Sequence, residues 1–172
     1  MGQTGGGVVN ESDTVVTDLI GLEGIDVALP ARTRASVLHE LVQLASRTGL
    51  LYDADGLLAA LQEREALCST ALPNGVAIPH PRQPMPYVSA EPLVCVGHVP
   101  RGIGFGSTHG GELSHLFFLI CCHEDRHHLQ VLARLMRILD AEMVDMLQRA
   151  ETGEGLLQIL IAKEMQVVAQ TK

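Results

Sequence analysis

The first half of the chain carries apolar residues at helical spacing in two segments. The earlier segment is predicted to run from about Thr33 to Gly49, because its apolar side chains recur at i, i+3, i+4 and i+7 and glycine commonly stops a helix. Those apolar positions are Leu38, Leu41, Val42 and Ala45. The later segment starts after Asp53 or Asp55, either of which suits a helix cap, and ends near Arg64 and Glu65. Two amphipathic helices are therefore expected in this half.

Helical spacing returns in the last third of the chain. A helix is predicted from about Asp125, and its apolar side consists of Leu129, Leu132, Met136 and Leu139. Two shorter helices are predicted over residues 141–148, with Asp140 as the cap, and over residues 155–163. The C-terminal part of the domain is therefore expected to be helical.

Extended segments lie between these helices and before them. Residues 25–29 form a short strand pattern that ends at Pro30, and residues 93–99 form another. Residues 115–122 are almost continuously apolar, which is typical of a strand buried on both faces. Turn-rich connections are predicted over residues 69–86 and 101–112. Helical segments on both sides of the strands predict one α/β domain with helices packed on a small mixed sheet.

Length and composition support one folded domain and exclude some functions. The chain has 172 residues, of which 47% are hydrophobic and only 3% aromatic, so the core must be aliphatic. A net charge of -8 argues against nucleic acid as a direct ligand, because phosphate binding needs clustered Lys and Arg. The longest apolar run, residues 116–122, is far shorter than the roughly 20 residues of a membrane-spanning helix, so no direct membrane insertion is expected.

The cysteines and the N-terminus indicate the compartment. The four cysteines, at positions 68, 95, 121 and 122, form no C-x-x-C pair and no spaced framework. The first ten residues are rich in glycine and lack both the basic and the apolar region of a secretory signal. The sequence therefore predicts a protein of the reducing cytoplasm.

Eight histidines are the compositional exception, and His80 has the most distinctive surroundings. Pro79 and Pro81 restrict the backbone on both sides, which favours an extended and accessible presentation of the imidazole. A neutral imidazole is a competent nucleophile, and Arg82 or Arg64 could supply the forked donors that a phosphoryl group requires. The alternative is a surface turn with an incidental histidine. The spacing alone leaves both interpretations open.

A second pattern, His123-Glu124-Asp125-Arg126-His127, formally matches the H-E-x-x-H signature of zinc hydrolases. That chemistry needs one helix running through both histidines, whereas this segment follows a strand pattern and is expected to have a helix cap at Asp125. A third ligand is available only from Glu142, Glu151 or Glu154. A zinc hydrolase therefore remains a minor alternative.

His128 opens the predicted helix that follows. A side chain at that position lies near a helix N-terminus, where the helix dipole favours an anion, so His128 could reach a phosphate. The alternative is an exposed histidine at a helix start. Periodicity does not separate these two interpretations.

Taken together, several segments resemble the enzyme IIA components of the bacterial phosphoenolpyruvate-dependent phosphotransferase system. The resemblance is closest to the fructose/mannitol type, and within it to the nitrogen-regulatory proteins. It rests on Arg-Glu-x-x-x-Ser-Thr at residues 64–70, Asn-Gly-x-Ala-x-Pro-His at 74–80, Leu-Phe-Phe-Leu-Ile at 116–120 and His-Leu-Gln-Val-Leu-Ala-Arg-Leu at 128–135. It implies a domain over residues 14–165, a flexible N-terminal tail at 1–13 and a C-terminal tail at 166–172.

The resemblance implies a role for particular residues. His80 matches the phosphorylated histidine, His128 the histidine that stabilises the phosphohistidine, and Arg64 the arginine beside it. The loop residues expected to support the phosphate are Ser69, Thr70, Asn74 and Gly75. The implied fold is a three-layer α/β/α domain with a small mixed sheet, and no metal or organic cofactor is expected.

The implied function is transfer of a phosphoryl group, which would make the chain a phosphotransferase component. The donor would be an HPr-type phosphocarrier protein, and the acceptor a IIB domain or a regulated kinase or transporter. A regulatory role is favoured because no membrane IIB or IIC segment occurs within the chain. A binding module that works without phosphorylation is the alternative. Cys68 and residues 71–73 depart from the family's glycine-rich pattern, which puts the loop's backbone donors in doubt.

Overall fold

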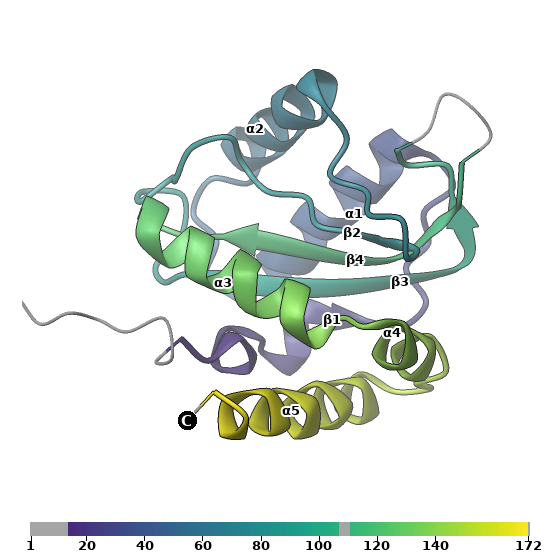
Figure 1. Cartoon of the computed structure of the whole chain (residues 1–172). Coiled ribbons are helices and arrows are strands. Elements are labelled where there is room, and N and C mark those ends of the chain that lie inside the picture. The colour runs from purple at the N-terminus through teal and green to yellow at the C-terminus, as the bar shows by residue number, and fades with distance from the viewer. Residues whose placement is uncertain (1–13, 107–110, 172) are drawn as a thin grey trace, which may run out of the picture.

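A four-stranded mixed sheet forms the middle layer of the protein (Figure 1). The computed structural model describes residues 14–106 and 111–171, so the expected N-terminal tail at 1–13 lies outside the described residues. The strand order is β1-β3-β4-β2, in which β3 and β4 are antiparallel and each short outer strand is parallel to its neighbour. The strands are β1 (Ile25–Asp26), β2 (Val76–Ala77), β3 (Leu93–Ile103) and β4 (Ser114–Cys121).

Helices α1 (Arg34–Arg47) and α2 (Ala54–Leu67) cover one face of the sheet. The side chain of Thr33 caps α1 and that of Asp53 caps α2, and Gly49 ends the first helix with a φ of 74°. These caps confirm both predicted helices. The core of this layer joins helix residues to every second strand residue, among them Leu41, Leu57, Leu61, Cys95, Phe117 and Leu119.

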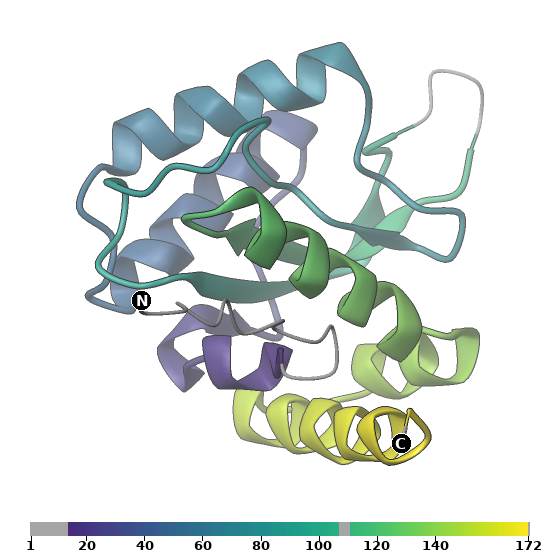
Figure 2. The same cartoon turned by 60° about the vertical axis from the view of Figure 1, so that its left-hand side comes forward.

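The opposite face carries α3 (Asp125–Ile138), α4 (Ala141–Gln148) and α5 (Gly153–Ala169), together with the 3-10 turns η2 (Val16–Leu19) and η3 (Leu22–Gly24) (Figure 2). Strand residues of the other parity point into this layer, because successive side chains of a strand alternate between faces. The core here includes Val96, Phe118, Ile120, Leu135, Leu147 and Leu160. Both layers together confirm the expected three-layer α/β/α fold.

Several predicted boundaries were wrong. The first strand ends at Asp26 instead of residue 29, because the Asp26 carboxylate accepts the N–H of Ala28 and turns the chain. Strand β3 continues to Ile103, beyond the predicted residue 99, across a register shift. Helix α5 continues to Ala169, so residues 166–169, expected in a C-terminal tail, are helical.

The predicted apolar face of α3 was wrong in part. The helix buries Val131, Leu135 and Ile138 against the sheet, while Leu129 and Met136 are 62% and 51% exposed. Both sets of residues follow helical spacing, so periodicity alone could not decide between them. Leu129 and Met136 therefore lie on the outer surface of the helix, whereas Leu139 is buried and Leu132 packs against the core.

The structure also describes the surroundings of the cysteines and the length and polarity of the helices. Cys95, Cys121 and Cys122 are buried and Cys68 is exposed, and all four are free thiols. Burial raises the pKa of the Cys95 thiol to about 12, which keeps that thiol protonated. Within residues 14–106 and 111–171, every helix is too short or too polar to cross a membrane.

Candidate functional site

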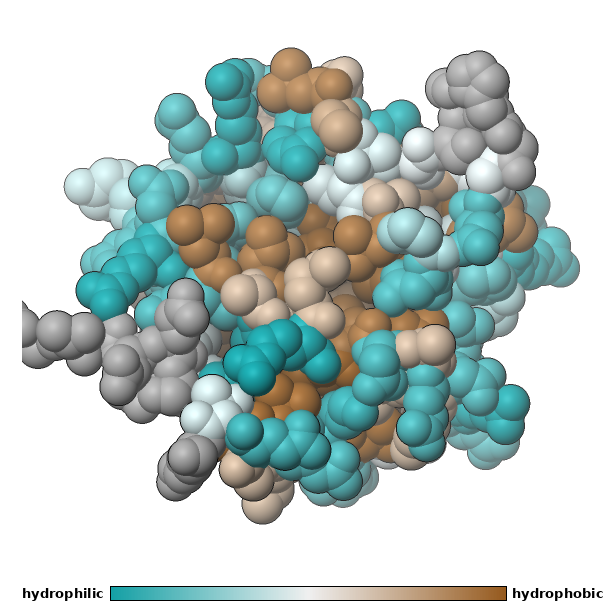
Figure 3. Space-filling model, in the orientation of Figure 1, coloured by the Kyte–Doolittle hydropathy of each residue, from teal (hydrophilic) through white to brown (hydrophobic). Residues whose placement is uncertain are grey.

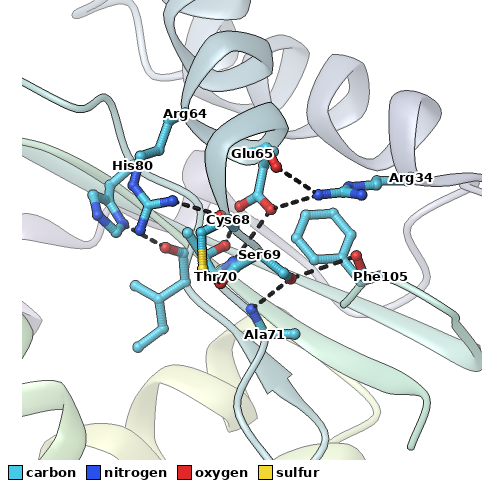
Figure 4. A network of polar contacts seen from close by, with 10 residues as sticks. Arg34, Arg64, Glu65, Cys68, Ser69, Thr70, Ala71, His80 and Phe105 are labelled. Carbon is cyan, nitrogen blue, oxygen red and sulfur yellow. Dashed lines mark hydrogen bonds and ion pairs between the residues drawn. The ribbon is translucent and has the colours of Figure 1, made fainter. Parts of the chain in front are cut away.

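The imidazole of His80 is held by an extended segment directly after β2. Pro79 and Pro81 are buried on either side, and the Pro79 carbonyl accepts the N–H of Ile120 on β4 at 3.0 Å. His80 Nδ1 lies 2.7 Å from the carbonyl oxygen of Ile78 (Figure 4). A carbonyl oxygen can only accept a hydrogen bond, so Nδ1 carries the proton in the neutral ring. The lone pair that remains for a nucleophilic attack is therefore on Nε2.

His128 lies beside His80, although the two residues are far apart in the sequence. Helix α3 begins shortly after β4, and β2 is the parallel neighbour of β4, so both strands lead to the same edge of the sheet. The two ring centroids are 4.9 Å apart and the ring planes are inclined by 44°. The structure thus brings together the two histidines that the resemblance selected.

Both imidazoles favour the neutral state. Burial is the main cause that lowers the pKa of His80, and the positive charge of Arg64 lowers it further, while the Ile78 hydrogen bond and the Glu65 charge oppose the shift. Burial also lowers the pKa of His128, and His80 contributes to that shift. A neutral His80 is the nucleophilic form.

The guanidinium of Arg64 completes the group. Arg64 is in the last turn of α2 and is half-buried, and its side chain extends toward His80 (Figure 4). Its Nη1 donates a hydrogen bond of 2.6 Å to the carbonyl oxygen of Cys68. This bond fixes the forked cationic guanidinium over the loop that follows α2.

His80 and Arg64 line a pocket of about 330 Å³, and the ring of His128 lies against that of His80. Polar groups form one side of it and apolar side chains of α3 form the other. Its lining residues are Arg64, Ser69, Thr70, Ala71, Leu72, Ile78, His80, Leu132 and Met136. Of the predicted loop residues, Ser69 and Thr70 therefore lie in the pocket.

Three backbone amides of the loop, whose availability the sequence put in doubt, have partners within the protein. The N–H of Thr70 donates to Glu65, that of Ala71 to the Ser69 hydroxyl, and that of Leu72 to the Val76 carbonyl. These bonds hold the loop against β2. The amides of Thr70, Ala71 and Leu72 are therefore engaged within the protein.

Asn74 and Gly75 are placed differently from the expectation. Asn74 Nδ2 donates to the Leu139 carbonyl at 3.1 Å, at the end of α3, and Gly75 precedes β2 with a φ of 81°. Neither residue lines the pocket. The phosphate support expected from these two residues stays a prediction. Gly75 provides the left-handed turn that starts β2.

The zinc pattern is divided by the start of α3. His123 precedes the helix cap Glu124, whereas His127 is in the first turn. His123 Nε2 lies 3.1 Å from the hydroxyl of Ser89, which itself donates to the Glu91 carbonyl, so the imidazole donates. Among residues 14–106 and 111–171, no group of three His, Cys, Asp or Glu side chains could hold a metal ion. The arrangement does not support a zinc hydrolase.

Sequence reasoning missed three residues near the site. Leu132 and Met136 were assigned to the core but line the pocket, because the helix face was misjudged. Glu65 was noted only as part of the family motif, yet its carboxylate binds the loop residue Thr70. Its position directly after Arg64 and five residues before Thr70 was the available signal.

Comparison with known families shows to which family the chain belongs. The family described as "Phosphoenolpyruvate-dependent sugar phosphotransferase system, EIIA 2" matches residues 18–163. The chain belongs to this family. The matched range contains every residue that lines the pocket of His80.

Two relatives show the range of proteins that contain such an EIIA domain. A nitrogen regulatory protein of Pseudomonas aeruginosa is 31% identical over 137 residues, which cover 78% of this chain and 87% of that protein. A fructose-specific EIIABC component of Bacillus subtilis is 27% identical over 148 residues, or 84% of this chain. The chain spans only 23% of that longer relative.

Solved structures show the same EIIA fold. The nitrogen regulatory protein IIA-Ntr of Neisseria meningitidis aligns with a TM-score of 0.73 and 25% identity, covering 86% of this chain and 99% of that one. The mannitol enzyme IIA of Escherichia coli, solved in complex with phosphorylated enzyme IIB, also aligns with a TM-score of 0.73, at 21% identity. It covers 84% of this chain and 99% of its own.

Proposed function

We propose that His80 carries a phosphoryl group between two proteins of the phosphotransferase system, in the cytoplasm. The observation that carries this proposal is the pairing of His80 Nδ1 with the Ile78 carbonyl, which leaves Nε2 as the nucleophile. The ring of His128 lies against the His80 ring, and Arg64 lines the same pocket as His80. Membership in the EIIA family supports the same role.

The proposed reaction is an in-line transfer between two imidazoles. The Nε2 lone pair of His80 attacks phosphorus and forms a P–N bond, while the P–N bond to the donor histidine breaks and its electron pair returns to the donor ring. His80 keeps its Nδ1 proton, which the Ile78 carbonyl stabilises as the ring becomes positively charged. Release to the next acceptor reverses these changes.

The neighbouring side chains would stabilise the charge on the transferred group. Phosphoryl transfer depends on positioning and on donors aimed at the equatorial oxygens. The Arg64 guanidinium supplies a forked cationic donor and His128 supplies an imidazole N–H. Ser69 and Thr70 line the same pocket, and their hydroxyls donate to the Phe105 carbonyl and the Glu65 carboxylate. Arg64 and His128 are therefore the proposed donors to the phosphate, and Ser69 and Thr70 form the supporting loop.

An HPr-type phosphocarrier protein is the proposed donor. The outer surface of α3 and the end of α2 present exposed apolar residues around the pocket, namely Leu67, Leu129 and Met136. Figure 3 shows apolar surface over this part of the molecule. Such a rim suits a protein surface better than a small polar phosphate donor. The acceptor is a IIB domain or a regulated kinase or transporter.

The favoured role is regulatory, in the nitrogen branch, because a nitrogen regulatory protein is 31% identical and is matched over 87% of its length. A fructose-specific EIIA component of Haloferax volcanii is 30% identical and is matched over 95% of its length, so sugar transport is the competing role. The apolar rim also favours a second candidate function. In that alternative, the unphosphorylated surface binds a target protein and phosphorylation is not required.

Phosphorylation of purified variants tests the proposal. The chain is incubated with phosphoenolpyruvate, enzyme I and an HPr-type carrier, and the acid-labile phosphate on it is measured. We expect stoichiometric labelling of the wild type and of His127→Asn, and none of His80→Asn.

Labelling of His80→Asn would overturn the assignment of the acceptor. A wild type that stays unlabelled while the HPr-type carrier is labelled would overturn the carrier role. Retention of a target by His80→Asn, together with an unlabelled wild type, would favour the binding module.

A further inference from the structure

A buried carboxylate lies next to the pocket. Glu65 follows Arg64 on α2 and is 4% exposed. Its Oε2 accepts the N–H of Thr70 at 3.2 Å, and its Oε1 accepts the Thr70 hydroxyl. From the other side, Nη2 of Arg34 lies 3.3 Å from Oε2 and donates to the Glu65 carbonyl at 2.7 Å (Figure 4). A buried charge persists only when it is paired in this way.

Thr70 connects that carboxylate to the nucleophile. The Thr70 carbonyl accepts the N–H of Ile78 at 3.1 Å, and the Ile78 carbonyl accepts Nδ1–H of His80 at 2.7 Å. One side of Thr70 is therefore fixed by Glu65 and the other by the segment that holds the imidazole. The chain of contacts runs without a gap from Arg34 to His80.

We propose that Glu65, held by Arg34, is a positioning residue that keeps the His80 ring in the Nδ1–H form with Nε2 facing the pocket. The expected effect on the transfer rate rests on the proposed phosphoryl transfer. The expected effect on the protonation of the His80 ring does not. Glu65 does not line the pocket, so it acts through Thr70 and Ile78. A displacement of about 1 Å at a reacting group can cost about 100-fold in rate, so a weakened anchor should slow the transfer.

A second buried carboxylate provides a matched control. Glu164 on α5 is 2% exposed and accepts the N–H groups of Val16 and Thr17 at 2.7 and 2.9 Å. It thereby anchors η2 on the opposite side of the sheet from Glu65. Glu65 and Glu164 are both buried, and each accepts two hydrogen bonds from a neighbouring segment of the chain. Only Glu65 is connected to His80.

The first experiment compares Glu65→Gln with Glu164→Gln. Glutamine keeps the size of the side chain but replaces one acceptor oxygen by a donor, so Thr70 or Arg34 loses its partner. We expect Glu65→Gln to lower the single-turnover rate of phosphoryl transfer by roughly 10- to 100-fold at saturating donor. The KM for the donor protein should stay near that of the wild type, because Glu65 is buried. Glu164→Gln should keep the wild-type rate.

A readout that needs no phosphoryl donor keeps this inference separate from the proposed function. Long-range ¹H–¹⁵N spectra report which ring nitrogen of a neutral histidine carries the proton. We expect the Nδ1–H form of His80 in the wild type and in Glu164→Gln, and a mixture of both forms in Glu65→Gln. The spectra are interpretable even if the wild type accepts no phosphate.

Variants of Arg34 keep the test usable if Glu65→Gln folds poorly. The Arg34 side chain is 43% exposed, so its replacement should disturb the core less. Arg34→Met removes the ion pair with Glu65. It should change the protonation of the His80 ring and lower the transfer rate in the same way as Glu65→Gln, but to a smaller extent. Arg34→Lys keeps a charge near Glu65 and should restore part of both.

Two results would overturn the positioning role. One is an unchanged Nδ1–H form of His80 in Glu65→Gln and Arg34→Met. The other is an equal loss of rate in Glu65→Gln and Glu164→Gln, which would indicate general destabilisation. A wild type that accepts no phosphate, with the expected shift of the ring in Glu65→Gln, would overturn the proposed function and leave the positioning role standing.

Discussion

Two pairs of histidines near α3 differ in what the fold does with them. His123 and His127 are four positions apart, yet the helix start at Asp125 separates them, and His123 is bound to Ser89. His80 and His128 are distant in sequence, yet their rings are 4.9 Å apart. Strand pairing and the position of a helix start decide which histidines can act together. A local pattern of residue types is therefore weaker evidence for a site than two segments that meet at one sheet edge.

The largest difference between the pairs should appear in the rate of phosphoryl transfer. His128→Asn removes an imidazole donor next to the transferred group, and loss of one such donor costs about 100-fold. His127→Asn changes the adjacent residue on the same helix and should stay within about twofold of the wild type. Single-turnover transfer from a labelled phosphocarrier measures both. Equal transfer rates of His128→Asn and His127→Asn would contradict the difference between the two pairs.

A smaller effect is expected on stability at His123. His123→Asn removes the hydrogen bond to the Ser89 hydroxyl and should lower the free energy of unfolding by about 1 kcal/mol. Its rate of phosphoryl transfer should equal that of the wild type. Urea denaturation gives the first quantity and the labelling assay the second. A loss of transfer with unchanged stability would contradict a structural role for His123.

The pH dependence of stability should distinguish the pairs further. The pKa values of His80 and His128 are lowered from 6.5 in the folded protein, so the unfolded chain takes up protons more readily than the folded one. The free energy of unfolding should therefore fall as the pH drops below 6.5 toward the lowered values. In a series of urea titrations, the double variant His80→Asn/His128→Asn should show a flatter dependence. A profile as steep as that of the wild type would show that other groups cause it.

The smallest expected effect concerns the electrostatic coupling between His80 and His128. His80 contributes to the lowered pKa of His128, so His80→Asn should raise that pKa toward 6.5. His127→Asn should raise it less, because His127 is a weaker cause. Histidine titrations followed by NMR resolve each ring. A larger shift in the His127 variant would contradict the observed geometry.

Helix caps explain why much of the fold was predictable. Thr33, Asp53 and Asp140 each bind a backbone N–H at a helix start, and these starts follow directly from residue type. The face of α3 was not predictable, because the apolar set with Leu135 and the apolar set with Leu132 both follow helical spacing. Only the tertiary structure shows which of the two packs against the sheet.

Part of the candidate site was likewise predictable from the sequence. His80, His128 and Arg64 came from the family resemblance, and the structure brings all three to one region. Asn74 and Gly75 belong to the same sequence motif as His80, but the Asn74 side chain binds the Leu139 carbonyl at the end of α3, and neither residue lines the pocket. Proximity in sequence is a poor guide when the connecting segment is extended.

The position of the phosphate on the imidazole tests the central claim most directly. Long-range ¹H–¹⁵N spectra of the phosphorylated, ¹⁵N-histidine-labelled protein identify both the residue and the ring nitrogen. The structure predicts phosphorus on Nε2 of His80, with the Nδ1 proton still donated to the Ile78 carbonyl. Phosphorus on Nδ1 of His80, or on His128, would contradict the account.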